Sequence, residues 1–129
     1  MKTAKGKFEI KATPIQADEI SEQIGFMRMT FDKKFEGVLD AKGSVSMMGI
    51  MDRELGSGGY VAIERITGTL EGRTGTFCLQ HSSLMNRNTP LQSIAVIPDT
   101  GTDDLAGITG SMTIDIVEGQ HYYNFHYEL

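Results

Sequence analysis

Apolar and polar residues alternate along most of this chain, so that every second side chain is apolar. Near the start, Phe8, Ile10 and Ala12 alternate with lysines and a glutamate. A period of two predicts β-strands that turn one face toward a core. About eight strands are expected on this pattern: Gly6–Thr13, Gly25–Leu39, Ser44–Met51, the two arms of a hairpin between Gly59 and His81, Leu91–Ile97, Thr109–Val117 and Gln120–Glu128.

The breaks between these strands coincide with glycine, proline and polar residues, which are typical of turns. The segment Pro14–Ser21 is predicted to be a loop or a short helical turn, with Pro14 closing the first strand. Further breaks are expected at a turn around Asp40–Gly43, at Gly56–Gly59, in a polar loop over Asn86–Pro90 and at a two-residue turn, Glu118-Gly119.

The order of these strands predicts an all-β fold in a single domain, residues 1–129, because sequential strands are joined by short turns. A sheet of this size closes into a barrel or stacks as a sandwich, since open edges promote aggregation. The 15 glycines favour a strongly bent sheet, and therefore an eight-stranded antiparallel barrel. Such a barrel encloses space for side chains or for one small ligand.

The central hairpin turns at Glu71-Gly72, and a two-residue turn fixes the register of its arms. The predicted pairs are Leu70 with Arg73, Ile66 with Phe77, Glu64 with Leu79 and Ala62 with His81. One face of the hairpin then carries Tyr60, Glu64 and His81 among apolar residues, and we expect this face to look into the barrel. Glu64 and His81 become diagonal neighbours whose side chains can meet.

Other polar residues share the predicted interior. The alternation directs His121, Tyr123 and Tyr127 of the last strand inward, and it sets Lys33 between Phe31 and Phe35. His126 falls on the outer side. Ionisable groups in a cavity of low polarity indicate function because their proton affinities are perturbed there. Lys33, Tyr60, Glu64, His81, His121, Tyr123 and Tyr127 are therefore candidates for ligand binding, and Glu64, His81 and Tyr127 are candidates for catalysis.

Each candidate also has a structural interpretation. A buried Glu64–His81 pair can serve to satisfy hydrogen bonds, and Lys33 can extend its amine out at the barrel rim. Tyr123 and Tyr127 can be packing residues of the core. The eight methionines fill core gaps or line an adaptable pocket.

Composition narrows the possible partners. The chain has 12 Lys and Arg against 17 Asp and Glu, a net charge of −5, and no basic stripe of the kind that binds nucleic acid. Its apolar runs are too short to span a bilayer, and the basic N-terminus has no apolar stretch of a signal peptide behind it. A single cysteine, Cys78, leaves no internal disulfide and fits a reducing compartment, so we expect a cytoplasmic protein.

No motif predicts a cofactor or a metal. The chain has no phosphate-binding glycine loop before a helix and no Cys/His cluster with zinc spacing. Two histidines and a carboxylate, His81, His121 and Glu64, are a conceivable metal set, but they come from separate strands without a His-x-His signature. Cys78 faces away from the apolar side and has no histidine beside it, which argues against a thiol nucleophile.

The outer face of the central hairpin carries Val61, Ile63 and Cys78, and it is too apolar for a freely solvated wall. A second subunit covering this face is the hypothesis that explains the pattern.

Four segments resemble a bacterial family of unknown function that is grouped with the allene oxide cyclase-like, calycin-like barrels. These are Tyr60–His81, Lys33-x-Phe35-x-Gly37-x-Leu39, Val96–Gly110 and the ending from His121 to Leu129. The part Gly101–Gly110 also looks like the glycine-threonine loop of plant dirigent proteins and allene oxide cyclases. The resemblance implies an eight-stranded antiparallel barrel and homo-oligomers, with trimers usual among the plant relatives. It implies no catalytic assignment, and the tryptophan expected near Thr13–Ile15 is absent.

Three functions follow as hypotheses. The first is the binding of a small, largely apolar ligand in the barrel, oriented by Glu64, His81 and the tyrosines. The second is an isomerase, cyclase or lyase in which Glu64 and His81 act as general acid and base and Tyr127 as a donor. The third is a structural or assembly role with a filled barrel.

Overall fold

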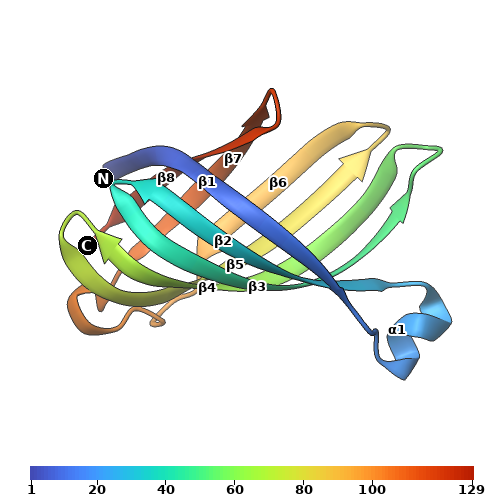
Figure 1. Ribbon diagram of the computed structural model, residues 1–129, viewed down its shortest axis with the longest axis horizontal. Helices are drawn as coiled ribbons and strands as arrows, with labels where there is room; N and C mark the ends of the chain where they lie inside the picture. Colours follow the sequence, from blue (N-terminus) through green and yellow to red (C-terminus); the bar gives the residue numbers. More distant parts are fainter.

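Eight antiparallel strands follow one another around a closed barrel, in which each pairs with its neighbours in sequence and β8 pairs with β1 (Figure 1). The computed structural model describes residues 1–129. The strands are β1 Lys2–Ile15, β2 Met27–Gly37, β3 Leu39–Asp52, β4 Ser57–Leu70, β5 Arg73–Asn86, β6 Thr89–Val96, β7 Thr109–Val117 and β8 Gln120–Glu128. The prediction of an eight-stranded antiparallel barrel rather than a sandwich is confirmed.

A short helix, α1 Glu19–Ile24, links β1 to β2 and projects from one end of the barrel (Figure 1). Asp18 caps it, since its carboxylate accepts a hydrogen bond of 2.9 Å from the backbone N–H of Ser21. Gly25 ends it in the left-handed conformation, with φ of 79°. No helix in the structure has both the length and the apolar character required to cross a lipid bilayer.

The turn between β2 and β3 lies earlier than predicted. It is made at Gly37 and Val38, where Gly37 has φ of 114°, and Asp40–Gly43 are regular strand residues of β3. The prediction was wrong because the polar residues Asp40 and Lys42 alternate with inward Ala41 as the outer face of a strand, not as a turn. This shift lengthens β3 and moves Gly43 into the middle of the sheet.

Two other boundaries differ from the prediction. Strand β1 continues through Pro14 to Ile15, with Pro14 paired to Met29 of β2. The expected loop Asn86–Pro90 shrinks to the two turn residues Arg87 and Asn88, which have φ of 48° and 67°.

Both predicted two-residue hairpins are confirmed. The central hairpin turns at Glu71-Gly72 and pairs Ala62 with His81, as the sequence indicates. Gly68 faces Gly75 in continuous register, so no bulge displaces the residues beyond them. The last hairpin turns at Glu118-Gly119 between β7 and β8.

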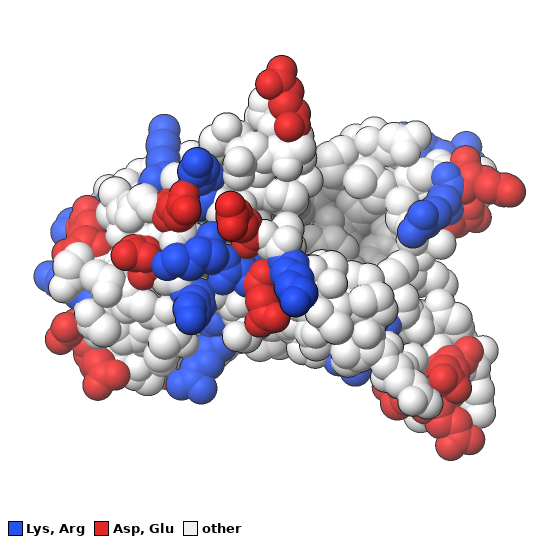
Figure 2. Space-filling view, in the orientation of Figure 1, with Lys and Arg blue, Asp and Glu red and all other residues white.

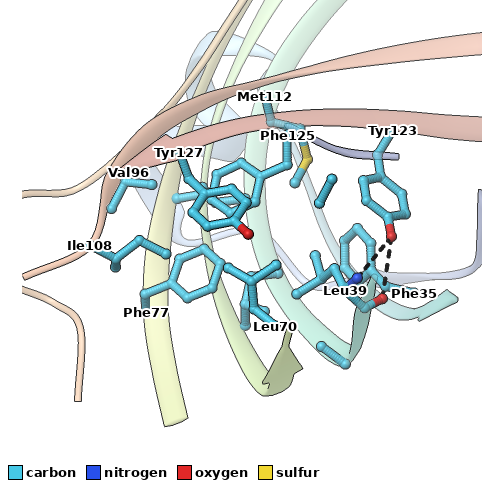
Figure 3. Packing of buried hydrophobic residues seen from close by; sticks show 14 of the residues in the cluster. Phe35, Leu39, Leu70, Phe77, Val96, Ile108, Met112, Tyr123, Phe125 and Tyr127 are labelled. Atoms are coloured by element: carbon cyan, nitrogen blue, oxygen red, sulfur yellow. Dashed lines mark hydrogen bonds between the residues drawn. The ribbon is translucent and has the colours of Figure 1, made fainter. Parts of the chain in front are cut away.

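One end of the barrel interior is filled with side chains, and we call it the packed half (Figure 3). Aromatic rings dominate it: Phe125 stacks between Phe77 and Tyr127, with ring centroids 5.5 Å and 5.3 Å away. The packed half consists of Ala4, Phe8, Phe35, Leu39, Ala41, Ile66, Leu70, Phe77, Leu79, Ile94, Val96, Leu105, Ile108, Met112, Tyr123, Phe125 and Tyr127. Both chain termini lie at this end (Figure 1).

The connection between β6 and β7 covers the end of the packed half. It contains a single 3₁₀ turn, η1 Asp103–Leu105, and buries Leu105 and Ile108 against the core. Its backbone also bonds to β5, through Thr102 to Thr76 at 2.9 Å and Ile97 to Cys78 at 2.9 Å. The connection therefore stands beside β5 where β6 has ended.

Toward the other end, β6 and β7 separate. Their ladder is limited to Ile94 with Met112 and Ala95 with Ser111, whereas β7 and β8 pair along their whole length. Beyond this point the amide Oε1 of Gln92 accepts a hydrogen bond of 3.1 Å from the backbone N–H of Ile114. We call this end of the barrel, with its parted strands, the open half.

Candidate functional site

The open half contains a cavity of about 240 Å³ inside the barrel. Figure 2 shows a recess without charged side chains, beside the projecting tip of the β7–β8 hairpin. The walls are mainly apolar and include no aspartate or glutamate. The cavity is lined by Phe8, Ile10, Phe31, Lys33, Val45, Met47, Tyr60, Ala62, His81, Gln92, Ile114, Ile116 and His121.

A buried cluster of Lys33, Glu64 and His81 lies between this cavity and the packed half. One oxygen of Glu64, Oε1, lies 3.1 Å from Lys33 Nζ and 2.7 Å from His81 Nε2. Glu64 itself is fully buried, while Lys33 and His81 line the cavity. The expectation that Glu64 and His81 meet is confirmed, and Lys33 joins them.

Lys33 does not extend to the rim. Its residue is only 7% exposed, and its ammonium lies 4.9 Å from the ring centroid of Phe8 and 5.8 Å from that of Phe35. The aromatic faces and the Glu64 carboxylate together compensate the buried positive charge. The interpretation of Lys33 as a side chain reaching out to solvent was therefore wrong.

Glycine at position 43 makes this cluster possible. Gly43 of β3 pairs with Lys33 of β2 on one side and with Ile66 of β4 on the other. A Cβ atom at this position would collide with Oε2 of Glu64. Because Gly43 has no side chain, Lys33 of β2 and Glu64 of β4 can meet across β3. Their ion pair therefore connects two strands that are not neighbours in the sheet.

The shared acceptor also assigns the histidine tautomer. Because Lys33 donates to Oε1, this oxygen acts as an acceptor, and Nε2 of His81 donates to it as well. A neutral imidazole protonated at Nε2 keeps Nδ1 as a free acceptor. Glu64 thus orients His81 in the manner of a carboxylate behind a general base.

Of the remaining candidates, Tyr60 and His121 line the cavity and are half-buried. The His121 ring lies 5.2 Å from that of Phe8, at a tilt of 45°. The outward orientation predicted for His126 agrees with its bond of 2.9 Å to the Thr3 hydroxyl, which is exposed.

Tyr123 and Tyr127 lie in the packed half, where neither lines the cavity. The Tyr123 hydroxyl donates to the carbonyl of Glu36 at 2.9 Å. It accepts from the N–H of Leu39 at 3.2 Å, a contact drawn in Figure 3. It thereby fixes the β2–β3 turn, and burial raises its pKa. Burial and then the neighbouring Glu71 carboxylate raise the pKa of Tyr127 to about 12.

A second hollow of about 240 Å³ adjoins the first and shares Met47 and Tyr60 with it. Its wall is formed largely by methionines and by the small residues Gly49, Gly58 and Gly59. Of the two roles expected for the methionines, lining a pocket fits the positions of Met27, Met47, Met51 and Met85.

These observations can be set beside known proteins. A family model described as "Protein of unknown function (DUF3224)" matches residues 4–127. The chain belongs to the DUF3224 family. It is 39% identical to a DUF3224 protein of unknown function from Shewanella oneidensis MR-1, whose crystal structure has a TM-score of 0.92 to it. That match covers 100% of this chain and 98% of the other. No curated protein sequence matches the chain.

Several lining residues of this DUF3224 chain were not singled out from the sequence, namely Ile10, Gln92, Ile114 and Ile116. The alternation directs them inward, but it does not indicate that the interior beside them is empty. Only Gln92 indicated a cavity in the sequence. A polar amide is unusual among the inward apolar residues of a strand whose barrel is filled, as at this position of β6. No group of three or more His, Cys, Asp or Glu side chains in the DUF3224 chain is placed to hold a metal ion.

Proposed function

We propose that the open half of the barrel binds a small, largely apolar molecule that carries a polar group. The observation that carries this proposal is the apolar cavity with Lys33 and His81 in its wall and Glu64 buried behind them. Cavities of a few hundred cubic ångströms with a few convergent polar groups are the usual form of a small-molecule site. The apolar walls supply affinity, and the polar cluster orients the ligand.

The rim of the cavity supports the same function. Ile116 turns toward the cavity from β7 and is nevertheless 64% exposed. A cavity wall that leaves large apolar side chains in water gains free energy when a ligand covers them, at about 25 cal/mol per Å². The cavity also argues against the filled barrel of a purely structural protein.

The test uses a neutral apolar fluorophore, N-phenylnaphthylamine, whose emission rises when it leaves water. We expect saturable binding to the wild type and loss of binding in Ile116→Asp, which places a charge in the cavity wall. Val117→Asp is the matched control, because Val117 is the next residue of β7, exposed but absent from the wall. Equal binding by both variants, or no binding by the wild type, contradicts the proposal.

Native mass spectrometry of the purified protein extends this test to the natural ligand. A retained mass that disappears in the Ile116→Asp variant and persists in Val117→Asp identifies the molecule that occupies the open half.

A catalytic function is the second candidate, favoured by the 2.7 Å contact between Glu64 and His81. An isomerase, cyclase or lyase needs a base in contact with its substrate, and His81 rather than the enclosed Glu64 meets this need. Tyr127 does not line the cavity, so it is not placed to act as the proton donor of such a reaction.

Two further parts of the proposal concern relatives and copies of the chain. The loop Gly101–Gly110, which closes the packed half, supports a place among the allene oxide cyclase-like barrels. The outer face of β4 exposes Val61 at 57% and Ile63 at 49%, which supports a homo-oligomer. The single cysteine, Cys78, supports a cytoplasmic location. Light scattering that gives a trimer or a dimer supports this assembly, and a clean monomer contradicts it.

A further inference from the structure

We propose that the molecule bound in the open half is an uncharged carbonyl compound, and that His81 exchanges the proton on the carbon beside its carbonyl group while Lys33 holds the carbonyl oxygen. This inference rests on the ligand-binding function proposed above. It assigns His81 as the base and Lys33 as the group that holds the carbonyl oxygen. The supporting observations are the geometry of the two side chains, the charge of their surroundings and the composition of the cavity wall.

Lys33 has hydrogen-bond donors to spare. An ammonium carries three N–H groups, and the structure gives Lys33 a single hydrogen bond, to Glu64 Oε1. Phe8 and Phe35 lie near the ammonium, and aromatic faces compensate its charge without taking up its N–H donors through conventional hydrogen bonds. An oxygen atom of a ligand is therefore the partner that this wall lacks.

The charge balance favours an uncharged oxygen over a carboxylate. The Glu64 carboxylate already compensates the Lys33 ammonium, and both are buried. A second negative charge in the same surroundings would lack a partner, and an unpaired buried charge is strongly unfavourable. A carbonyl oxygen accepts the free N–H without adding charge.

His81 has the complementary property. Its Nε2 is bound to Glu64, and the imidazole lines the same cavity as Lys33. Its remaining nitrogen, Nδ1, can take up a proton, and the carboxylate of Glu64 then stabilises the imidazolium. The carboxylate Oε1 links base and donor, since it lies within hydrogen-bond distance of both.

The exchange step is balanced within the cavity. His81 Nδ1 removes a proton from the carbon next to the carbonyl, and the electron pair of that C–H bond forms a carbon–carbon double bond. The π electrons of the carbonyl move to its oxygen, where Lys33 Nζ donates a hydrogen bond to the enolate. Once the Nδ1 proton of the imidazolium has exchanged with solvent, return of the solvent-derived proton to the same carbon gives exchange. Where a double bond conjugated with the enolate extends its charge to another carbon, return of the proton to that carbon gives isomerisation.

The experiment measures this exchange without knowledge of the natural ligand. Benzylacetone is incubated with the protein in D₂O, and proton NMR follows the loss of signal from the hydrogens beside its carbonyl. We expect wild-type exchange to exceed that of His81→Gln by about a hundredfold or more, the range of general acid–base catalysis. Glutamine keeps a donor for Glu64 and removes the base. His126→Gln is the matched control, because His126 lies on the outer side of β8.

The role of Lys33 needs a variant that leaves no unpaired charge. Lys33→Met alone would strand the buried Glu64 carboxylate, so the double variant Lys33→Met/Glu64→Gln is used, with Lys34→Met as its surface control. We expect the double variant to lose exchange while it keeps a cooperative unfolding transition. Unchanged exchange in this folded double variant would overturn the role of Lys33.

The binding measurement separates the two proposals. If benzylacetone displaces N-phenylnaphthylamine but exchanges no faster than with His81→Gln, the proton-transfer proposal is wrong and the binding function stands. If the fluorophore binds and benzylacetone neither displaces it nor exchanges, the carbonyl class is wrong. If the fluorophore does not bind to the wild type, both proposals fail.

Discussion

The two halves of the barrel are made by the same strands with the same alternation, yet one is filled and the other is hollow. In the packed half the inward residues are large, and Phe35, Phe77 and Phe125 are completely buried. In the open half the inward faces of β3 and β4 include the small residues Gly49, Gly58 and Ala62, which line the hollows. Alternation thus defines which face is inside, and side-chain volume decides whether that inside stabilises the fold or receives a ligand.

The largest difference between the halves should appear in the cost of losing an aromatic ring. We expect Phe125→Ala to lower the free energy of unfolding by about 4 kcal/mol, because it leaves a cavity between Phe77 and Tyr127. Phe31→Ala, in the half-exposed wall of the open half, should cost less than about 2 kcal/mol. Urea unfolding measures both, and equal costs would contradict the division into two halves.

The boundary between the halves depends on the buried ion pair. Glu64→Ala should lower the free energy of unfolding by about 3 kcal/mol or more, because it leaves the Lys33 ammonium buried without its carboxylate. The double variant Lys33→Met/Glu64→Leu should recover most of this loss, since apolar residues replace both charges. The exposed pair Lys34–Asp40 is the control, and Lys34→Ala should cost less than about 1 kcal/mol in the same urea titration.

A substitution at position 43 tests the same boundary between the two halves. Gly43→Ala should cost about 2 kcal/mol, since its Cβ displaces the Glu64 carboxylate from the space it fills. Gly59→Ala is the control in β4, where the nearest atom to a new Cβ is Leu84 Cδ2 at 3.1 Å, the end of an exposed side chain. Thermal unfolding of both variants gives the comparison, and a larger effect at Gly59 would contradict it.

The smallest expected effect is a pH dependence that arises in the packed half. An unfolded tyrosine loses its proton near pH 10, whereas folded Tyr127 keeps it to about 12. The folded state therefore holds more protons in this window, and its stability is complete below pH 10 and falls as the pH rises toward 12. Unfolding titrations should show a shallower fall for Tyr127→Phe, and also for Glu71→Gln, which removes the second cause of the shift.

Much of the fold followed from the sequence because hairpins are local. The Glu71-Gly72 turn fixes the register of β4 and β5, and so the contact of Glu64 with His81 could be predicted. The partner of Lys33 could not, because it lies two strands away and the contact crosses Gly43. The turn expected at Asp40–Gly43 hid this relation, since it removed position 43 from the strand.

The position of the cavity within the barrel escaped prediction for a different reason. Inward apolar residues such as Phe77 and Ile114 look alike in an alternating pattern, although one is enclosed and the other borders empty space. Whether space remains depends on residues from several strands at one level of the barrel, and this level is set by the stagger of the whole sheet.

The parted strands β6 and β7 have a consequence for the kinetics of the barrel. On the open side of the Ile94–Met112 pair no ladder holds these strands, and the single bond from Gln92 to Ile114 spans the gap. A molecule entering sideways has to break this one side-chain bond instead of a row of backbone bonds. We therefore expect a shorter side chain at position 92 to accelerate sideways entry and exit together.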